Sequence, residues 1–167
     1  AFREATRLDP GCSEAWFQLG RLERDEYLRT MCYPDHLAKA IDLFGEALRR
    51  RRTDEETLLN LAFLHSLRRM HRTGLQYATR AAARHAESAR ARLLQGMLLT
   101  RLLRFDEADS SFQNAFRLMS EGERARYENI APLLPFDERD LYLSSFPAAR
   151  GDRNRRFCIE YDPTPST

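Results

Sequence analysis

The chain has 167 residues, a mass of 19.5 kDa and a formal net charge of +2. This length suits one compact domain or a short repeat array, and it excludes two full catalytic domains. The seven glycines are scattered singly, so neither common phosphate-binding glycine loop is present. Valine is absent and isoleucine is rare, whereas leucine, alanine, arginine and glutamate abound. This shortage of β-branched residues predicts an all-α protein.

Helix start and stop signals place the elements in chain order. We expect helices near residues 1–8, 13–31, 35–51, 54–70, 73–85, 88–102 and 105–119. Residues 121–134 also have helical character, and Pro135 starts a last helix that ends before Pro147. No apolar run approaches the roughly 18 residues of a membrane span, so we expect a soluble protein.

The helices repeat with an offset of 34 residues. One set of aligned triplets is Ala40, Phe44, Ala47; Gly74, Ala78, Ala81; and Ala108, Phe112, Ala115. Once about eight extra residues in the first full copy are allowed for, the same register aligns Trp16, Leu19, Gly20; Leu58, Leu61, Ala62; and Arg92, Gln95, Gly96. Periods of this length are typical of helical repeat arrays, in which each unit buries its apolar face against a neighbour.

This pattern resembles the tetratricopeptide repeat (TPR), in which helix A carries a large residue, a leucine and a small residue, and helix B a small residue, an aromatic residue and an alanine. The resemblance implies a right-handed α-solenoid over residues 1–120. Its parts are a partial copy at 1–12 and copies at 13–54, 55–88 and 89–120, followed by a helical extension at 121–147 and an extended tail at 148–167.

Packing explains the small residues of this register. Gly20, Ala62 and Gly96 should let each helix A approach its helix B closely, and Phe44 and Phe112 should fill the gap towards the next unit.

The first full copy carries about eight extra residues between Glu23 and Lys39. We interpret them as a longer helix A through Arg29 and a turn at residues 32–34, with Asp35 capping helix B. A short ordered loop is the alternative.

The end of the chain resembles another family. Phe157 and Cys158 take the place of an aromatic pair, and Asp-Pro-Thr-Pro-Ser-Thr follows at 162–167. This segment is similar to the one that precedes the core of bacterial GWxTD-domain proteins. The resemblance implies a bacterial protein of the cytoplasm or cell envelope, of which the present sequence, starting at Ala1, would be one segment.

No pattern of catalytic or metal-ligating residues is present. The three cysteines and four histidines lack zinc-site spacing, and no nucleophile–base motif occurs. His65 takes a position that is often tyrosine in the TPR family, which implies a packing role. We therefore expect no enzyme activity, no metal and no cofactor.

The most informative surface is the concave face that the A helices line, which we call the A-helix face. The family register places on it Phe17, Arg21, Arg24, Leu59, Phe63, Leu93, Met97 and Arg101. Chaperone-binding members of the family clamp a terminal carboxylate with lysine and asparagine, which are absent here. An apolar floor with arginines at its edges suits a partner segment that carries some acidic residues. The alternative is that a neighbouring helix or the chain's own tail covers these side chains.

These observations predict a protein–protein interaction scaffold or an accessory subunit of a larger assembly. A nucleic-acid-binding helical repeat is the alternative, supported by the arginine excess and by the run of arginines at 49–52. That run also falls in the last turn of a helix, where cations offset the helix dipole, so we expect no nucleic-acid partner.

Overall fold

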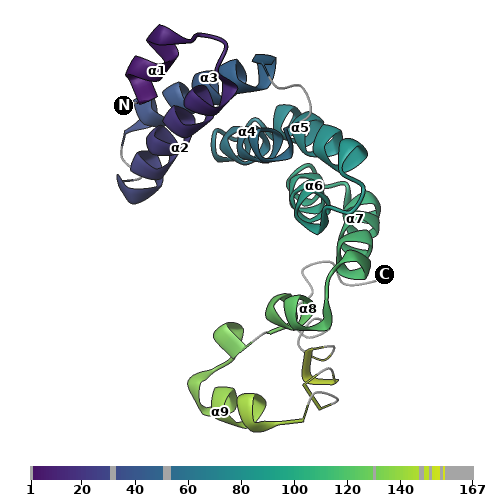
Figure 1. The fold of residues 1–167 in the computed structure, drawn as a ribbon. Helices are drawn as coiled ribbons and strands as arrows, with labels where there is room; N and C mark the ends of the chain where they lie inside the picture. The colour runs from purple at the N-terminus through teal and green to yellow at the C-terminus, as the bar shows by residue number, and fades with distance from the viewer. Residues whose placement is uncertain are drawn as a thin grey trace. The chain divides into compact units, whose positions relative to one another are not determined.

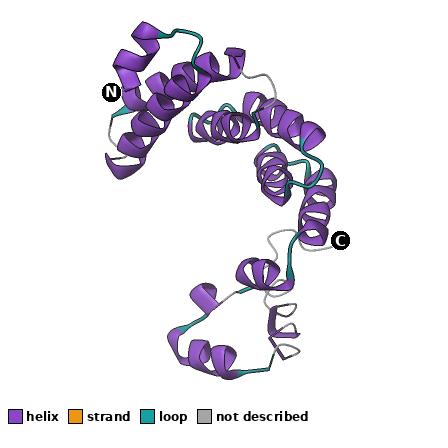
Figure 2. Ribbon diagram, in the orientation of Figure 1, coloured by secondary structure: helices purple, strands orange, loops and turns teal. Residues whose placement is uncertain are grey.

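The computed structural model describes residues 2–30, 33–50, 54–129, 131–146, 149–150, 152–154 and 156. These residues contain helices and turns and no β-strand, which confirms the all-α prediction (Figures 1 and 2). The chain divides into two compact units, Ala1–Leu118 and Met119–Thr167. No helix within the described ranges has the length and apolar character needed to cross a membrane.

The first unit contains the seven helices that the sequence predicts. They are α1 (Phe2–Leu8), α2 (Ser13–Thr30), α3 (Pro34–Arg50), α4 (Glu55–Leu67), α5 (His71–Arg84), α6 (Ala89–Arg101) and α7 (Phe105–Leu118). Helices α2 with α3, α4 with α5 and α6 with α7 pack as antiparallel pairs, and α3 contacts α4 as α5 contacts α6. Figure 1 shows α2, α4 and α6 along one side of this unit and α3, α5 and α7 along the other.

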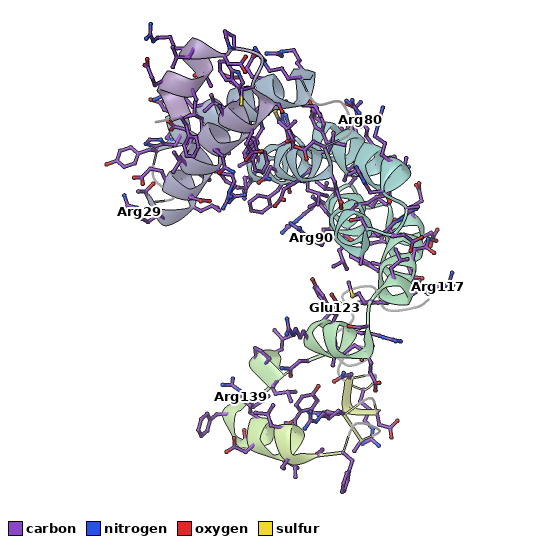
Figure 3. All side chains as sticks on the ribbon, viewed as in Figure 1. Arg29, Arg80, Arg90, Arg117, Glu123 and Arg139 are labelled. Atoms are coloured by element: carbon purple, nitrogen blue, oxygen red, sulfur yellow. The ribbon has the colours of Figure 1, made fainter. Side chains whose placement is uncertain are left out.

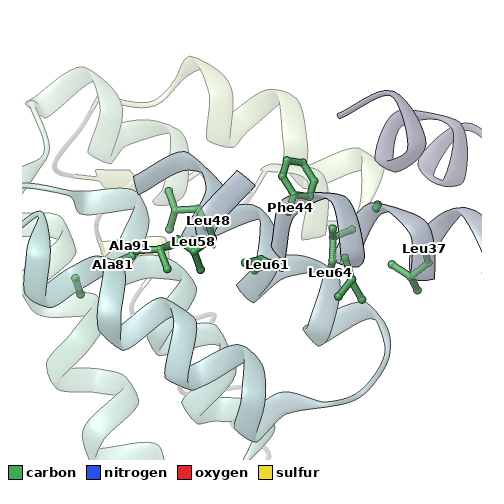
Figure 4. Packing of buried hydrophobic residues seen from close by; sticks show 12 residues of the cluster. Leu37, Phe44, Leu48, Leu58, Leu61, Leu64, Ala81 and Ala91 are labelled. Atoms are coloured by element: carbon green, nitrogen blue, oxygen red, sulfur yellow. The ribbon is translucent and has the colours of Figure 1, made fainter. Parts of the chain in front are cut away.

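The core of the first unit lies between successive pairs. Twelve buried residues from α3, α4, α5 and α6 form its main cluster, eight of which are labelled in Figure 4. Phe44, Leu58 and Leu64 are fully buried in it. Burial of such side chains contributes about 1.5–3 kcal/mol each, so the array is held together by contacts between pairs as well as within them.

A glycine and a phenylalanine meet where α2 crosses α3, and again where α6 crosses α7. A Cβ atom on Gly20 would lie 3.1 Å from the ring of Phe44, and one on Gly96 would lie 2.6 Å from Phe112. The close approach expected at both glycines is therefore present. Each ring packs against the glycine of its own helix pair. Phe44 also belongs to the main cluster with residues of α4, so packing towards the next unit describes only part of its contacts.

In the middle pair, α4 and α5, two alanines stand where the other pairs have a glycine and a phenylalanine. Ala62 and Ala78 replace the glycine and the phenylalanine, and both are fully buried together with Leu98 of the following helix. Ala78 is smaller than the phenylalanines that it replaces, and Ala62 is larger than the glycines that it replaces. The two changes in volume offset each other in part, so the 34-residue register is kept in this pair.

The extra residues of the first full copy extend helix α2 to Thr30, as predicted. Helix α3 begins at Pro34, which places Asp35 in its first turn rather than at the cap. The side chain of His36 lies 2.6 Å from Glu23, measured between Nδ1 and Oε2, and so links the two helices beyond the repeat register.

The turns after α4 and α6 have the same geometry 34 residues apart. Arg69 and Leu103 have φ angles of 58° and 60°, in the left-handed region that favours glycine. The amide of Met70 donates to the carbonyl of His65, and the amide of Arg104 to that of Leu99. These bonds close α4 and α6, which explains why α4 ends three residues before the predicted boundary at 70.

The second unit contains α8 (Glu121–Tyr127), a 3-10 helix at Ala131–Leu133 and α9 (Phe136–Ser144). Ser120 and Glu123 form a capping box at the start of α8. Residues 149–150, 152–154 and 156 are helical, so the expectation of extended chain from 148 was wrong for them. The rest of the expected tail, residues 157–167, lies outside the described ranges.

Among the described residues of the second unit, Ala131, Leu134 and Tyr142 form a small apolar cluster. Polar side chains add bonds to main-chain carbonyls. Arg139 donates to the carbonyls of Ala131 and Leu134, and Asn154 donates to that of Glu128.

Candidate partner-binding surface

The predicted residues of the A-helix face come from three helices. Helix α2 supplies Phe17, Arg21 and Arg24, α4 supplies Leu59 and Phe63, and α6 supplies Leu93, Met97 and Arg101. Their exposure differs widely, from buried Leu59 to Met97 with 56% of its surface exposed. The A-helix face is therefore not uniform, and its two ends have different chemistry.

A pocket of about 320 Å³ lies at the α2 end of the A-helix face. It is lined by Ser13, Glu14, Phe17, Gln18 and Arg21 of α2 and by Asp54 and Glu56 at the start of α4. The ring of Phe17 packs edge-on against Phe44 with the ring centres 5.5 Å apart, which fixes the apolar wall of the pocket. Three carboxylates and one guanidinium surround this wall, so the pocket favours a partner that brings a cation or amide donors.

Arg24 does not project freely from the A-helix face. Its Nη1 donates to Oδ1 of Asn60 at 2.5 Å, and its Nε donates to Asp25 at 2.8 Å. Asn60 is buried and its amide nitrogen donates to the carbonyl of Glu56. Arg24 therefore ties α2 to α4, and removing it would leave a buried acceptor unpaired.

The expected apolar floor belongs partly to the core. Leu59 is only 6% exposed and is a member of the main cluster, and Phe63 is half-buried against the same cluster. A neighbouring helix thus covers Leu59, which was the alternative that the sequence left open.

At the α6 end the A-helix face is open and basic. Met97 is exposed, Leu93 is half-buried, and the side chains of Arg90 and Arg101 are exposed on the same helix. Figure 3 shows Arg90 on the inner side of the array and Arg80 on the outer side. An exposed thioether between guanidinium groups suits apolar and acidic side chains of a partner.

Basic and acidic residues are unevenly distributed along the chain, although the basic stretch contains no long run of consecutive arginines. Between Glu56 and Asp106 the sequence contains nine arginines and one acidic residue, Glu87. Helices α5 and α6 contain no aspartate or glutamate. A count of acidic residues for each predicted helix could have found this signal.

The arginine run at 49–52 has partners inside the array. Arg49 and Arg50 both pair with Glu46, and the guanidinium of Arg50 lies 4.8 Å from the centre of the Trp16 ring. Arg50 and the indole nitrogen of Trp16 both donate to the carbonyl of Pro10. Arg51 and Arg52 lie outside the described residues. Arg50 therefore joins α3 to α2 and the loop before it, whereas Arg49 pairs within α3.

His65 lies in the core between α4 and α5. It is 8% exposed and stacks on Tyr77, with ring centres 5.5 Å apart and planes 11° from parallel. Burial, followed by the nearby charge of Arg68, lowers the pKa of the imidazole. The described part of the chain contains no group of three or more histidine, cysteine, aspartate or glutamate residues placed to hold a metal ion.

Comparison with solved structures identifies the fold. One structure of MamA superposes with a TM-score of 0.60 at 20% identity, over 77% of this chain and 64% of that chain. Another MamA structure gives a TM-score of 0.66 at 17% identity, over 96% of this chain and 88% of that one. The second TPR of Spaghetti (RPAP3), bound to the HSP90 peptide SRMEEVD, gives 0.51 at 17% identity, over 64% of this chain and 99% of that one.

This chain thus spans less than two thirds of the first MamA structure. No family model and no curated protein matches the sequence. The resemblance of the C-terminal residues to GWxTD proteins lies outside the described ranges and stays a prediction. The structural likenesses, together with the 34-residue register, show that the fold of this chain is that of a TPR-type helical repeat.

Proposed function

We propose that the chain is a protein–protein interaction scaffold that binds a segment of a partner protein along its A-helix face. The observation that carries this proposal is the chemistry of that face, which combines the Phe17 pocket at one end with exposed Met97 at the other. A related fold, the second TPR of RPAP3, holds a short peptide. Repeat arrays use such extended surfaces for binding.

The charge distribution defines the partner segment. Glu14, Asp54 and Glu56 surround the α2 end, whereas α6 contributes Arg90 and Arg101 at the other end. A segment with basic or amide-bearing residues at one end, acidic residues at the other and apolar anchors between them is complementary to this face. The sequence alone predicted an amphipathic or extended segment with some acidic residues, without the basic or amide-bearing end.

The test is affinity purification from the native source with three full-length baits. They are the wild type, Arg21→Glu/Met97→Glu on the A-helix face, and Arg69→Glu/Met70→Glu at the exposed α4–α5 turn. The two variants make the same chemical change at exposed residues. The proposal expects co-purifying proteins that the first variant loses and the second keeps. Identical sets of proteins on both variants would contradict it.

The chain's own tail is a second candidate occupant of the A-helix face. Residues 157–167 contain Phe157, Ile159 and Tyr161 at alternating positions, which in an extended segment point to one side. Deletion of residues 157–167, which leaves the contacts of Asn154 in place, should then increase the fluorescence of a hydrophobic dye with wild-type Met97 and much less with Met97→Glu. Unchanged dye binding on deletion would exclude the tail.

Nucleic-acid binding is the alternative function, and the basic stretch between Glu56 and Asp106 favours it. Scattered arginines supply sequence-independent attraction that falls steeply with salt. Titration of labelled RNA and DNA at two salt concentrations should show weak, salt-sensitive binding. Submicromolar and sequence-selective binding at physiological salt would favour this alternative over the scaffold.

A further inference from the structure

A second hollow lies on the other side of the array, and we call it the B-helix pocket. Its volume is about 760 Å³, and it lies between α5 and the turn that joins α6 to α7. The lining residues are Arg72, Leu75, Gln76, Thr79, Arg80 and Ala83 of α5, with Leu102 and Arg104 of the turn. The α5 residues are spaced by three or four or are adjacent, so they form one face of that helix.

The lining of the pocket combines apolar and basic side chains. Leu75, Ala83 and Leu102 supply apolar surface, and every charged lining residue is an arginine. Thr79, which also lines it, accepts a hydrogen bond from Gln95 at 3.1 Å, so α5 is held against α6. A hollow of this size has room for several side chains of a partner.

Two of the three arginines have no ion-pair partner among the described residues. Arg104 makes a two-bonded ion pair with Glu107, with both nitrogen–oxygen distances 2.6 Å. Arg72 and Arg80 form no ion pair with any residue in the described ranges, and α5 itself contains no carboxylate. They are eight residues apart, which corresponds to about 12 Å along the helix axis.

The turn beside the pocket presents a large apolar side chain in an unfavourable backbone conformation. Leu103, between the lining residues Leu102 and Arg104, is 75% exposed and has a φ of 60°. Phe105, the next residue but one, is 51% exposed. Exposed leucine and phenylalanine next to a hollow extend the apolar surface that a partner could cover.

We propose that the B-helix pocket is a second docking site, which takes an acidic amphipathic segment of a partner protein. Leucine or phenylalanine side chains of that segment enter the hollow beside Leu75 and Leu102. Two carboxylates about 12 Å apart, roughly two helical turns, pair with Arg72 and Arg80. The lining disfavours a basic segment, since the guanidinium groups of Arg72 and Arg80 would repel it.

The lining favours protein over nucleic acid as the partner. Proteins that bind single strands combine a basic groove with aromatic side chains on which bases stack. None of the residues that line the B-helix pocket is aromatic, although Phe105 is exposed beside it, and its apolar lining residues are aliphatic. An aliphatic surface is complementary to leucine and phenylalanine side chains.

The experiment selects peptides from a random 16-residue display library on the full chain and measures the dissociation constants of the enriched peptides. We expect peptides with at least two acidic residues and several leucine or phenylalanine residues. Arg72→Glu/Arg80→Glu should weaken their binding by at least about tenfold, as expected for the loss of two charged contacts. The matched control, Arg117→Glu/Arg126→Glu at exposed residues that line neither the B-helix pocket nor the A-helix face, should stay within about twofold of the wild type.

Three results would overturn the assignment. They are enriched peptides without acidic residues, equal binding by Arg72→Glu/Arg80→Glu, and tighter binding of a 16-nucleotide uridine strand that depends on the same two arginines. Circular dichroism of each variant checks that the helices are intact. Because Arg21 and Met97 are unchanged in both variants, this test can fail while the proposed A-helix-face function stands.

Discussion

Gly96 offers the sharpest test of the packing between helices. A Cβ atom there would lie 2.6 Å from Cε1 and 2.8 Å from Cδ1 of Phe112. Normal carbon–carbon contact is about 3.5–4.0 Å, so the ring must move by about 1 Å to admit a methyl group. Gly45 is the matched control, because it also lies inside a helix and a Cβ atom on it would have no heavy atom within 4 Å.

The two alanine substitutions should differ in their effect on the free energy of unfolding. Both gain about 0.5–1 kcal/mol of helix propensity, and only Gly96→Ala adds an overlap that costs about 1–3 kcal/mol. Because the propensity gain is common to both, the difference between the two variants isolates the overlap. We expect Gly45→Ala to be stabilised and Gly96→Ala to be less stable than Gly45→Ala by about 1–3 kcal/mol.

Urea unfolding followed by circular dichroism measures this difference. Repeating the measurement in a Phe112→Ala variant shows whether the Phe112 ring causes it. With Phe112→Ala in place the overlap is gone, so the same Gly96→Ala change should become stabilising by about 0.5–1 kcal/mol. Equal stability of Gly45→Ala and Gly96→Ala in the wild-type background would refute the close contact between α6 and α7.

Two further predictions concern a turn and a buried base. Leu103→Gly should raise the free energy of unfolding by about 1 kcal/mol, because glycine accepts the φ of 60° without the steric penalty of a side chain; Leu102→Gly, where φ is −96°, should lower it, and equal effects in urea unfolding would contradict the argument. Burial lowers the pKa of His65, whereas in the unfolded chain it is about 6.5, so just below pH 6.5 the unfolded chain binds more protons and stability falls as the pH falls. Unfolding at pH 7.5 and 5.5 should show a smaller loss for His65→Phe than for the wild type, and an equal loss would remove His65 as the cause.

The fold could be predicted from sequence because the informative residues act locally. Phe44 and Phe112 lie two 34-residue repeats apart, and their contacts with the glycines that they cover are made within one helix pair. The longer helix α2 could also be expected, since its residues keep helical character up to Thr30. In each case a short range of sequence contains all the interacting residues.

The A-helix face was harder to predict because its exposure depends on how pairs stack. Leu59 has the position of a groove residue in its own helix, yet the approach of the neighbouring helices buries it. The hydrogen bond from Arg24 to Asn60 joins residues that are 36 positions apart, and the extra residues of the first full copy lie between them in the sequence. Asp54 joins the Phe17 pocket only because α4 begins beside α2. Predicting these contacts requires the distance and angle between neighbouring helix pairs, and the repeat pattern does not give them.

The stacking of helix pairs in series has a consequence for multivalent binding. The main contacts of α2 are with α1 and α3, while those of α7 are with α6, so no central element touches every part of the first unit. A distortion at one pair reaches the others only through the intervening interfaces and weakens at each of them. Two ligands on well-separated pairs should therefore bind with free energies that add, and the array would hold them at a set separation without cooperativity. Binding of one ligand would then fix the position of the second without changing its affinity.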